Sequence, residues 1–386
     1  MNLRLETPLA CHGEEAVLAF LEYLRYPGVV KLTLQIKLLP DPSQASTLLA
    51  TMRKANTACN RISEIAWEKK IFNQFKLHAA SYREIKDSFG LSAQVVVRCI
   101  SKVADAYKLD RKTKRVFKPL GAITYDERIL SYAKDRISLW SISGRLKIPF
   151  ICHRPDWLPF VKGEADLITR KGKFFLFQTV EIPEERIKDV EEFLGVDFGL
   201  INIATLSTGE KMSGKEIERY RIKRQCVRSS LQAKCTRGSR RTLKRLSGKE
   251  RTTARIVNHT IAKRIVEKAK AEGKGIALEN LKGIRLRSVK KGRAFRSRVG
   301  RWSFFQLRNF IEYKARIAGA PVVLVDPRYT SQRCSQCQSL GSRNGESFKC
   351  ACGFVGHADV NAARNIAFLG GTVNCPEKPV LSVLTH

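Results

Sequence analysis

Acidic residues and long apolar runs are both scarce in this sequence. It has 36 Asp and Glu against 71 Lys and Arg, a formal net charge of +35. A surplus of this size repels itself unless a polyanion neutralises it. No stretch approaches the roughly 20 apolar residues that span a bilayer. The first residues include acids where a secretory signal has a basic and then an apolar segment. We therefore expect nucleic acid as a partner, no membrane partner, and a cytoplasmic location.

Length and composition indicate a globular protein with more than one domain. The 386 residues exceed what one ordinary core holds, and 43% of them are hydrophobic, which excludes a disordered chain.

The N-terminal half is expected to combine a β-barrel with helices. Lys31–Leu39 alternates apolar and polar residues, as a strand does. Ser43 is the predicted N-cap of a helical region that breaks near Ser81 and at Gly90. Short β-rich runs follow up to Ile182, with a hairpin turn just before Phe174. The first strand and these later strands would form one barrel into which the helices are inserted.

The C-terminal half predicts a different α/β domain. A strand hairpin, helix, strand, helix and strand follow one another, as expected of an RNase H-like core, although such a fold analogy proves no activity. The predicted strands span residues 193–198, 201–206, 211–213, 275–278 and 322–325, and the predicted helices span 215–234, 239–271 and 302–318.

Three carboxylates lie at the ends of these elements. Asp197 and Glu279 each end an apolar strand, and Asp359 begins a helix. Each alone also fits a structural role, such as a turn or helix-start acid. Together they would repel one another without cations, and oxygen-rich clusters suit Mg²⁺ or Mn²⁺. Two such ions, roughly 3.5–4 Å apart, support in-line phosphodiester hydrolysis. We therefore predict that all three residues bind two Mg²⁺ ions and act in catalysis.

Four of the 11 cysteines are clustered as Cys334-x2-Cys337-x12-Cys350-x1-Cys352. Two close pairs separated by a loop favour one structural Zn²⁺ with four thiolates over two disulfides, which are disfavoured inside a cell. His357 lies nearby and is more typical of a helix-entry residue than of a ligand. The seven remaining cysteines are scattered and are predicted to be reduced thiols: Cys11, Cys59, Cys99, Cys152, Cys226, Cys235 and Cys375.

Residues 211–300 are the most basic part of the chain, with 29 Lys or Arg against six Asp or Glu. The one-sided sign favours a phosphate-tracking surface over an ordinary solvated helix face. Phe295 and Trp302 lie among the arginines as possible stacking groups, although Trp302 also fits a core position. The predicted nucleic-acid contacts are Arg293, Arg296, Arg298, Arg301 and Arg328.

Four segments between Gly195 and Ala367 resemble TnpB, a transposon-encoded family of RNA-guided nucleases related to miniature type V CRISPR effectors. They are GVDFGLINIATLSTG, IALENLKGI, VDPRYTSQRCSQC and FKCACGFVGHADVNAARNIA, in the family's order. One departure is Gln338, which stands where the family often has glycine. The resemblance implies a guide RNA, a double-stranded target DNA that is unwound, and one RuvC site that cuts both strands. It also implies the three carboxylates as catalytic triad and the four clustered cysteines as zinc ligands.

The resemblance also implies a domain plan. It is a multidomain α/β protein with an RNase H-like (RuvC) core that contains an inserted zinc ribbon, and an N-terminal β-barrel (wedge) with an inserted helical recognition domain. The expected bounds are an extension at 1–30, a wedge at 31–40 and 113–190, a recognition insertion at 41–112, a nuclease at 191–329 and 357–386, and a zinc module at 330–356.

Three other interpretations stay open at this point. An RNase H-like core also carries out strand transfer in DNA transposases. A zinc-containing RNA-guided regulator that does not cut would explain the charge and the cysteines, but not the three placed acids. A small CRISPR effector shares the same chemistry and differs only in its genomic neighbourhood. The sequence leaves the oligomeric state undetermined.

Overall fold

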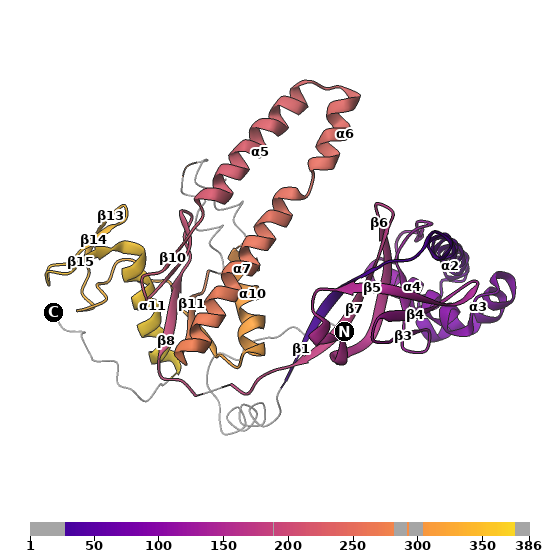
Figure 1. The fold of residues 1–386 in the computed structure, drawn as a ribbon, viewed down its shortest axis with the longest axis horizontal. Coiled ribbons are helices and arrows are strands. Elements are labelled where there is room, and N and C mark those ends of the chain that lie inside the picture. The colour runs from indigo at the N-terminus through magenta and orange to yellow at the C-terminus, as the bar shows by residue number, and fades with distance from the viewer. Residues whose placement is uncertain (1–27, 188, 282–291, 293–303, 375–386) are drawn as a thin grey trace. The chain divides into compact units, whose positions relative to one another are not determined.

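The computed structural model describes residues 28–187, 189–281, 292 and 304–374 (Figure 1). Two compact units divide the chain after Gly28 and after Ile182, so that Val29–Ile182 forms one unit and the chain from Pro183 onward forms the other. The predicted multidomain α/β organisation is confirmed. The predicted extension at residues 1–30 lies almost wholly outside the described residues.

A seven-stranded sheet forms the body of the first unit, and it nearly closes on itself. Its strand order is β2-β6-β7-β1-β5-β4-β3. The end strands β2 and β3 are consecutive in the chain, separated only by Asp126–Ile129, so the two edges must lie close together. The Tyr125 hydroxyl of β2 donates to the Trp140 carbonyl of β4 at 3.0 Å across this gap. The strands are β1 (Val29–Leu38), β2 (Ile123–Tyr125), β3 (Leu130–Tyr132), β4 (Arg136–Ser141), β5 (Gly144–Cys152), β6 (Val161–Arg170) and β7 (Lys173–Pro183).

Alternation of side chains sets the two faces of this sheet. Along β7 buried and partly exposed residues alternate over nearly its whole length. Successive side chains of a strand point to opposite faces, so one face supplies the core. The β6–β7 hairpin turns at Lys171 and Gly172, with φ of 53° and 73°. Two positive φ values favour the tight turn that matches strand twist, and they confirm the predicted hairpin.

Three helices are inserted between β1 and β2. They are α2 (Pro42–Glu68), α3 (Gln74–Phe89) and α4 (Ala93–Leu109). Asp41, and not the predicted Ser43, caps α2, because its carboxylate accepts from the Gln44 backbone NH in a capping box. The predicted break near Ser81 is also wrong. The Ser81 hydroxyl donates to the Leu77 carbonyl at 2.7 Å, which satisfies it inside α3. Gly90 ends α3 in the left-handed region, as predicted.

The second unit is built on a five-stranded sheet with order β10-β9-β8-β11-β12. Strands β8, β11 and β12 are parallel, and β9 and β10 continue the sheet antiparallel. Helices α7 and α10 share a core with one face of the sheet, and α11 covers the other. The bounds are β8 (Phe193–Asp197), β9 (Asn202–Leu206), β10 (Lys211–Ser213), β11 (Gly275–Glu279), β12 (Val322–Val325), α7 (Lys249–Glu272), α10 (Phe304–Ile317) and α11 (Ala358–Asn374).

Close approach of α11 to the sheet depends on Gly195 in β8. A Cβ at this position would lie 1.9 Å from the Ala363 carbonyl oxygen and 2.6 Å from the Ala367 nitrogen. Backbone atoms cannot move aside as a flexible side chain does, so only glycine fits. The residue thus fixes how closely the helix that carries Asp359 packs on the strand that carries Asp197.

Helices α5 (Lys215–Ala233) and α6 (Arg237–Leu246) form a hairpin that extends from the sheet (Figure 1). The predicted single helix over residues 239–271 is wrong, because Gly248 at φ 81° separates α6 from α7. A small three-stranded sheet follows β12, with β13 (Ser342–Asn344), β14 (Ser347–Lys349) and β15 (Val355–His357). Among the described residues, no helix is long and apolar enough to cross a membrane.

Candidate active site and cysteine cluster

Two of the three predicted acids leave neighbouring strands at the same edge of the sheet. Leu278 of β11 pairs with Val196 of β8 in parallel register, and Glu279 and Asp197 are the next residues on each strand. Asp359 is the second residue of α11, which packs against β8. The sheet and the helix therefore bring together three carboxylates that are far apart in the sequence.

Burial and like charge both disfavour the ionised form of Asp197 in this group. The pKa of Asp197 is raised to about 8, first by burial and then by the charges of Glu279 and Asp359, while Arg343 opposes the shift. A carboxyl group with such a pKa is held in an environment that calls for positive charge. The donor set, three carboxylates without a thiolate, suits a hard divalent cation such as Mg²⁺.

Asp359 already has two polar partners. The Arg343 Nη2 of β13 donates to its Oδ1 at 2.8 Å, and the Asn202 Nδ2 of β9 donates to its Oδ2 at 3.2 Å. The arginine partly balances the negative charge of the site. Sequence reasoning missed both residues, since neither has a distinctive position in a motif until the sheet places it beside the acid.

Glu279 is held by a polar chain that runs to α11. The residue is only 8% exposed, and its carboxylate accepts from the Thr330 hydroxyl at 2.6 Å. The carbonyl of Thr330 in turn accepts from the Asn365 side chain at 2.8 Å. Since Asn365 and Asp359 share one helix, this chain links the positions of two acids. The signal in the sequence is the run DVNAARN, where buried polar residues interrupt small apolar ones.

The four clustered cysteines converge as predicted. The Sγ atoms of Cys334 and Cys352 lie 3.7 Å apart, and those of Cys337 and Cys350 lie 3.5 Å apart. All four sulfurs lie within 4.8 Å of one another, which no other group of metal-ligand residues in the described part of the chain achieves. Four sulfurs at such distances suit the corners of one tetrahedral site, whereas two separate disulfides would need S–S contacts near 2 Å.

Local backbone geometry supports the cluster. A backbone hydrogen bond from Ser339 leads the causes that lower the pKa of Cys337 to about 6. A backbone hydrogen bond from Phe354 lowers the pKa of Cys352, but hydrogen bonds with the neighbouring thiols raise it on balance to about 12, so the thiols interact closely enough to share one site. Gln338, which stands where the TnpB family often has glycine, has φ 62°. The position thus needs a left-handed residue, and glutamine occupies it at a conformational cost.

Asn361 and His357 connect the cysteine cluster to α11. The buried Asn361 side chain accepts from the Ser335 NH at 2.8 Å and donates to the Arg333 carbonyl at 2.7 Å. The His357 Nδ1 accepts from the Asp359 NH at 3.2 Å, so it acts as the predicted helix-entry residue. Asp359 therefore lies between the cysteine cluster and the sheet.

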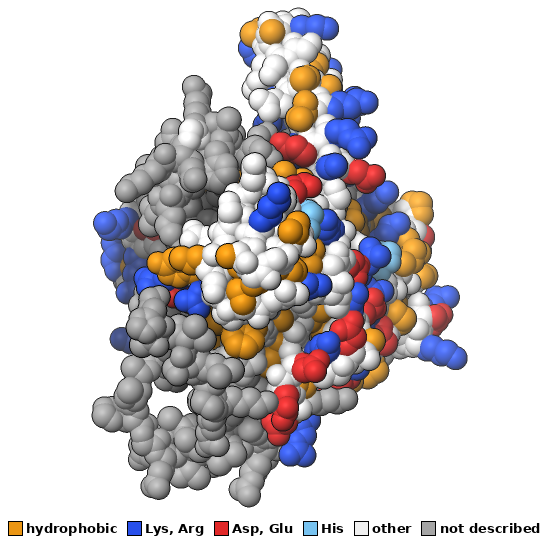
Figure 2. Space-filling model, turned by 90° about the vertical axis from the view of Figure 1, so that its left-hand side faces the viewer, with side chains coloured by type: hydrophobic (Ala, Val, Ile, Leu, Met, Phe, Trp, Pro, Cys, Tyr) orange, Lys and Arg blue, Asp and Glu red, His pale blue; other side chains and the backbone are white. Residues whose placement is uncertain are grey.

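Among the described residues of this unit, the α5–α6 hairpin carries a group of basic side chains. Its Lys and Arg side chains are mostly exposed, and they gather on the extension at the top of Figure 2. Arg328 is 83% exposed, with its Nε 3.8 Å from Asp326. The other four predicted contacts, Arg293, Arg296, Arg298 and Arg301, lie outside the described residues, as do Phe295 and Trp302.

Comparison with known proteins bears on this site directly. Residues 304–366, from α10 through the cysteine cluster to α11, match the family model described as the Cas12f1-like TNB domain. The CRISPR-associated endodeoxyribonuclease Cas12f1 of Sulfoacidibacillus thermotolerans is 36% identical over 220 residues, which cover 51% of this chain and 50% of that protein. The TnpB-like protein MJ0751 of Methanocaldococcus jannaschii is 29% identical over 260 residues, covering 66% of this chain and 89% of the relative.

Solved structures share the fold. A Cas12f1–sgRNA–target DNA complex matches at a TM-score of 0.56 and 14% identity, covering 88% of this chain and 99% of that chain. CasPhi-2 (Cas12j) bound to crRNA and phosphorothioate DNA matches at 0.54 and 12% identity, covering 93% and 94%. The predicted relationship to TnpB and to miniature type V effectors is thus confirmed. The match covers about half the length of the Cas12f1 of Sulfoacidibacillus thermotolerans, and 40% of a second Cas12f1, from Syntrophomonas palmitatica, which is 32% identical over 206 residues.

Proposed function

We propose that this protein is a transposon-associated, RNA-guided DNA endonuclease. The observation that carries the proposal is the convergence of Asp197, Glu279 and Asp359 at one edge of the sheet, where the strands β8 and β11 and the helix α11 meet. Burial and the two neighbouring charges raise the pKa of Asp197 there. A shift of this kind, caused by burial and like charges, is typical of groups that bind cations or act in catalysis. The strand order, with three parallel and two antiparallel strands, supports an RNase H-like (RuvC) assignment.

In this proposal the three carboxylates hold two Mg²⁺ ions. Bound there, the ions would supply an activated water and stabilise the leaving oxygen of a phosphodiester. Thr330 keeps the Glu279 carboxylate oriented through its 2.6 Å hydrogen bond. Arg343 donates to the Asp359 carboxylate at 2.8 Å and partly balances its charge. A divalent ion bound by Asp359 would take over that role, and the guanidinium would then be available to a phosphate.

The cysteine cluster would hold one structural Zn²⁺. Four thiolates leave no open coordination position, so the ion would have no catalytic part. Its effect would be to fold the chain between β12 and α11, because Cys334, Phe348 and Ala358 form one small core. Loss of the ion would therefore displace Asp359, whose helix begins beside that core.

We further propose that residues 29–182 form the wedge and the helical recognition insertion, and that the unit from Pro183 onward forms the nuclease with its zinc module. A guide RNA and an unwound target DNA are the proposed partners. The basic α5–α6 hairpin and Arg328 supply phosphate contacts in this proposal.

Co-purification tests the proposed function. The protein is expressed with about 200 base pairs of its native downstream DNA, and any bound RNA is sequenced after a moderate-salt wash, which phosphate-tracking contacts with a cognate RNA should survive. One defined RNA, whose variable end directs Mg²⁺-dependent cleavage of matched DNA by wild type and not by Asp197→Ala, supports the proposal. Heterogeneous, salt-labile RNA would favour a transposase or an unguided nuclease. Unchanged cutting by Asp197→Ala would rule out the site.

A further inference from the structure

Between α4 and β2 of the first unit, the chain crosses the surface without helix or strand. We call residues Arg111–Lys118 the basic strap. This segment, RKTKRVFK, has five basic residues and no acid. Its Lys114 and Lys118 side chains are exposed, as is the intervening Val116, at 79%. A connection of this composition is most often a solvated loop.

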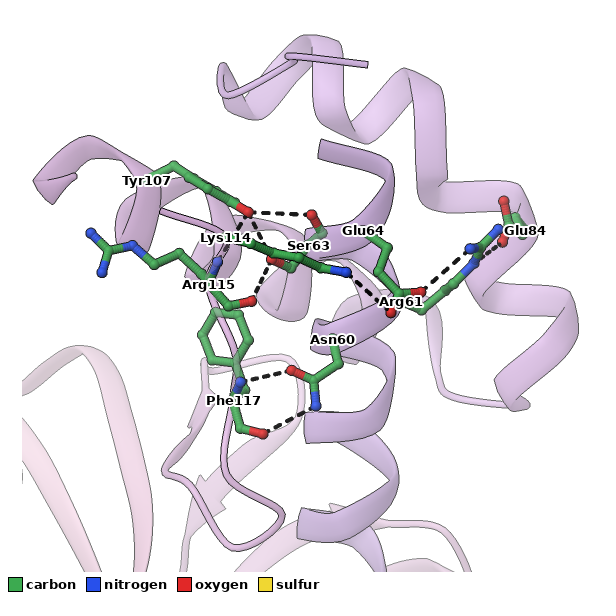
Figure 3. Close-up of polar contacts among 9 residues, drawn as sticks. All are labelled: Asn60, Arg61, Ser63, Glu64, Glu84, Tyr107, Lys114, Arg115 and Phe117. Atoms are coloured by element: carbon green, nitrogen blue, oxygen red, sulfur yellow. Dashed lines mark hydrogen bonds and ion pairs between the residues drawn. The ribbon is translucent and has the colours of Figure 1, made fainter. Parts of the chain in front are cut away.

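Unlike such a loop, the strap is held along its backbone by α2 (Figure 3). The Asn60 Oδ1 accepts from the Phe117 NH at 2.7 Å, and the Asn60 Nδ2 donates to the Phe117 carbonyl at 3.1 Å. The Ser63 hydroxyl donates to the Arg115 carbonyl at 2.6 Å. Side chains of α2 thus satisfy the backbone NH and carbonyl groups of the strap, as a neighbouring strand would in a sheet.

Further hydrogen bonds hold the chain on both sides of these contacts, and we call the whole set the clamp. The Tyr107 hydroxyl of α4 accepts from the Arg115 NH at 3.2 Å and lies 2.9 Å from the Ser63 hydroxyl. The Asn56 Nδ2 donates to the Gly121 carbonyl at 3.0 Å. Asn56, Asn60 and Ser63 are spaced as one face of a helix, so α2 presents a polar stripe to the strap and to the residues just after it. Asn56, Ser63 and Tyr107 are fully buried.

Buried polar residues destabilise a protein unless their hydrogen bonds are made. A stripe of buried polar residues packs no better against a connecting segment than apolar residues would. Its effect is to fix the strap backbone, which carries the exposed lysines. Fixing a segment in advance lowers the ordering cost when a ligand binds it.

Alternation along the strap leaves Lys112, Lys114 and Lys118 exposed to solvent. Arg115 and Phe117 make the backbone contacts, and the Phe117 ring lies beneath the Lys102 ammonium at 4.9 Å. Lys114 is 3.5 Å from Glu64, whose other carboxylate oxygen is shared with Arg61. Arg115 is paired with Asp110, whose carboxylate lies 3.1 Å from its Nη2. In the described part of the chain the strap therefore presents Lys112 and Lys118 without an acidic partner, and Lys114 with a shared one.

We propose that the basic strap is a nucleic-acid binding site that holds the phosphodiester backbone of the guide or the target. This rests on the proposed function, and it assigns a contact in the first unit that is separate from the basic hairpin of the second. Recognition would be by charge and independent of base sequence, since a row of lysines offers no bidentate base contact.

A charge-matched pair of variants tests the site in the full-length protein. The strap variant carries Lys112→Gln, Lys114→Gln and Lys118→Gln. The control variant carries three substitutions of exposed lysines on the strand turns of the same unit, Lys134→Gln, Lys171→Gln and Lys173→Gln. Fluorescence anisotropy measures binding to a single-stranded RNA, a DNA duplex and an RNA–DNA hybrid, each about 20 nucleotides long, at several salt concentrations.

The expected result is a change in salt dependence. Each phosphate contact contributes about 0.9 to the slope of log affinity against log salt for B-DNA and about 0.7 for single strands. The strap variant should lose about two to three units of that slope on at least one probe, with affinity at low salt lower by about tenfold or more. The control variant should keep the wild-type slope. A loss confined to the RNA probe assigns the strap to the guide, and a loss on the DNA or hybrid probe assigns it to the target.

A second variant tests the clamp. Asn60→Ala removes both hydrogen bonds to Phe117 and no charge, so affinity should fall about three- to tenfold while the salt slope stays unchanged. Strap and control variants with equal slopes and affinities would overturn the proposal, and the surface lysine changes leave the fold intact for that comparison. Failure of wild type to bind any of the three probes would instead contradict the proposed function.

Discussion

Substitution of Asp197 by Asn should stabilise the protein when no divalent cation is present. The pKa of Asp197 is raised from 3.8 to about 8 by burial and by its acidic neighbours. Each pKa unit corresponds to about 1.4 kcal/mol, and partial relaxation around the charge leaves a penalty on the order of 2–4 kcal/mol near pH 8. Asparagine has nearly the same shape without the charge, so the variant escapes this penalty.

The sign of the pH dependence follows from linkage. The folded state binds a proton at Asp197 that the unfolded state has already released, so this group loses its contribution to stability as pH rises from about 4 to about 8. The melting temperatures of wild type and Asp197→Asn should nearly coincide near pH 4 to 5. Near pH 8 the variant should melt higher, by about 5–10 °C for a unit of this size.

Thermal unfolding in metal-free buffer, without a chelator that would remove zinc, measures this difference. Addition of Mg²⁺ or Mn²⁺ should raise the melting temperature of wild type and should leave that of the variant almost unchanged. Cleavage should be lost in the variant at every pH. A constant melting difference between pH 5 and pH 8, or an equal response of both proteins to Mg²⁺, would refute the assignment of Asp197 to a repulsive cation site.

Three further outcomes are expected. Thr330→Val removes the hydrogen bond to Glu279 and should lower cleavage about tenfold with little change in nucleic-acid affinity. Thr330→Ser keeps the hydroxyl and should retain most of the activity, and an equal loss in both variants would point to packing instead. Arg343→Gln removes the cation that competes with a metal ion at Asp359. Without nucleic acid, Mg²⁺ should therefore raise the melting temperature of the variant more than that of wild type, and an equal rise in both would argue against competition. Cys350→Ser should lower bound zinc, measured by atomic absorption, from about one ion per chain and unfold the region before α11, while Cys226→Ser, an exposed cysteine outside the cluster, should not.

Several elements followed from local pattern alone. Alternation of apolar and polar residues predicted β1, because the side-chain period of a half-buried strand is visible in sequence. Short apolar runs predicted β8, β9 and β11, and turn residues predicted the β6–β7 hairpin. The helix boundaries were less accurate. Ser81 reads as a helix breaker, yet its hydroxyl bonds one turn back, and Gly248 divides a helix that its neighbours would continue. Whether a helix continues or ends at such a residue depends on which hydrogen bonds its surroundings permit.

The candidate site shows the same division. Asp197, Glu279 and Asp359 were predicted because each carboxylate interrupts an apolar or small-residue segment at the end of an element. Arg343 and Thr330 were missed, since an exposed arginine in a hairpin and a threonine in a loop have no local signal. Their importance depends on β13 and the loop after β12 folding back onto the edge of the sheet.

The sequence by itself determined the chemistry available to this protein: a strong basic surplus, three placed acids and four cysteines with metal-ligand spacing. Residue type and spacing carry that information because metals and phosphates select donor atoms and charge. Tertiary structure alone decided how these groups act on one another. The shifted pKa of Asp197, the hold of Thr330 on Glu279 and the clamp of α2 on the basic strap all come from burial and from contacts between distant segments. Such contacts depend on how the chain packs, which local pattern does not encode.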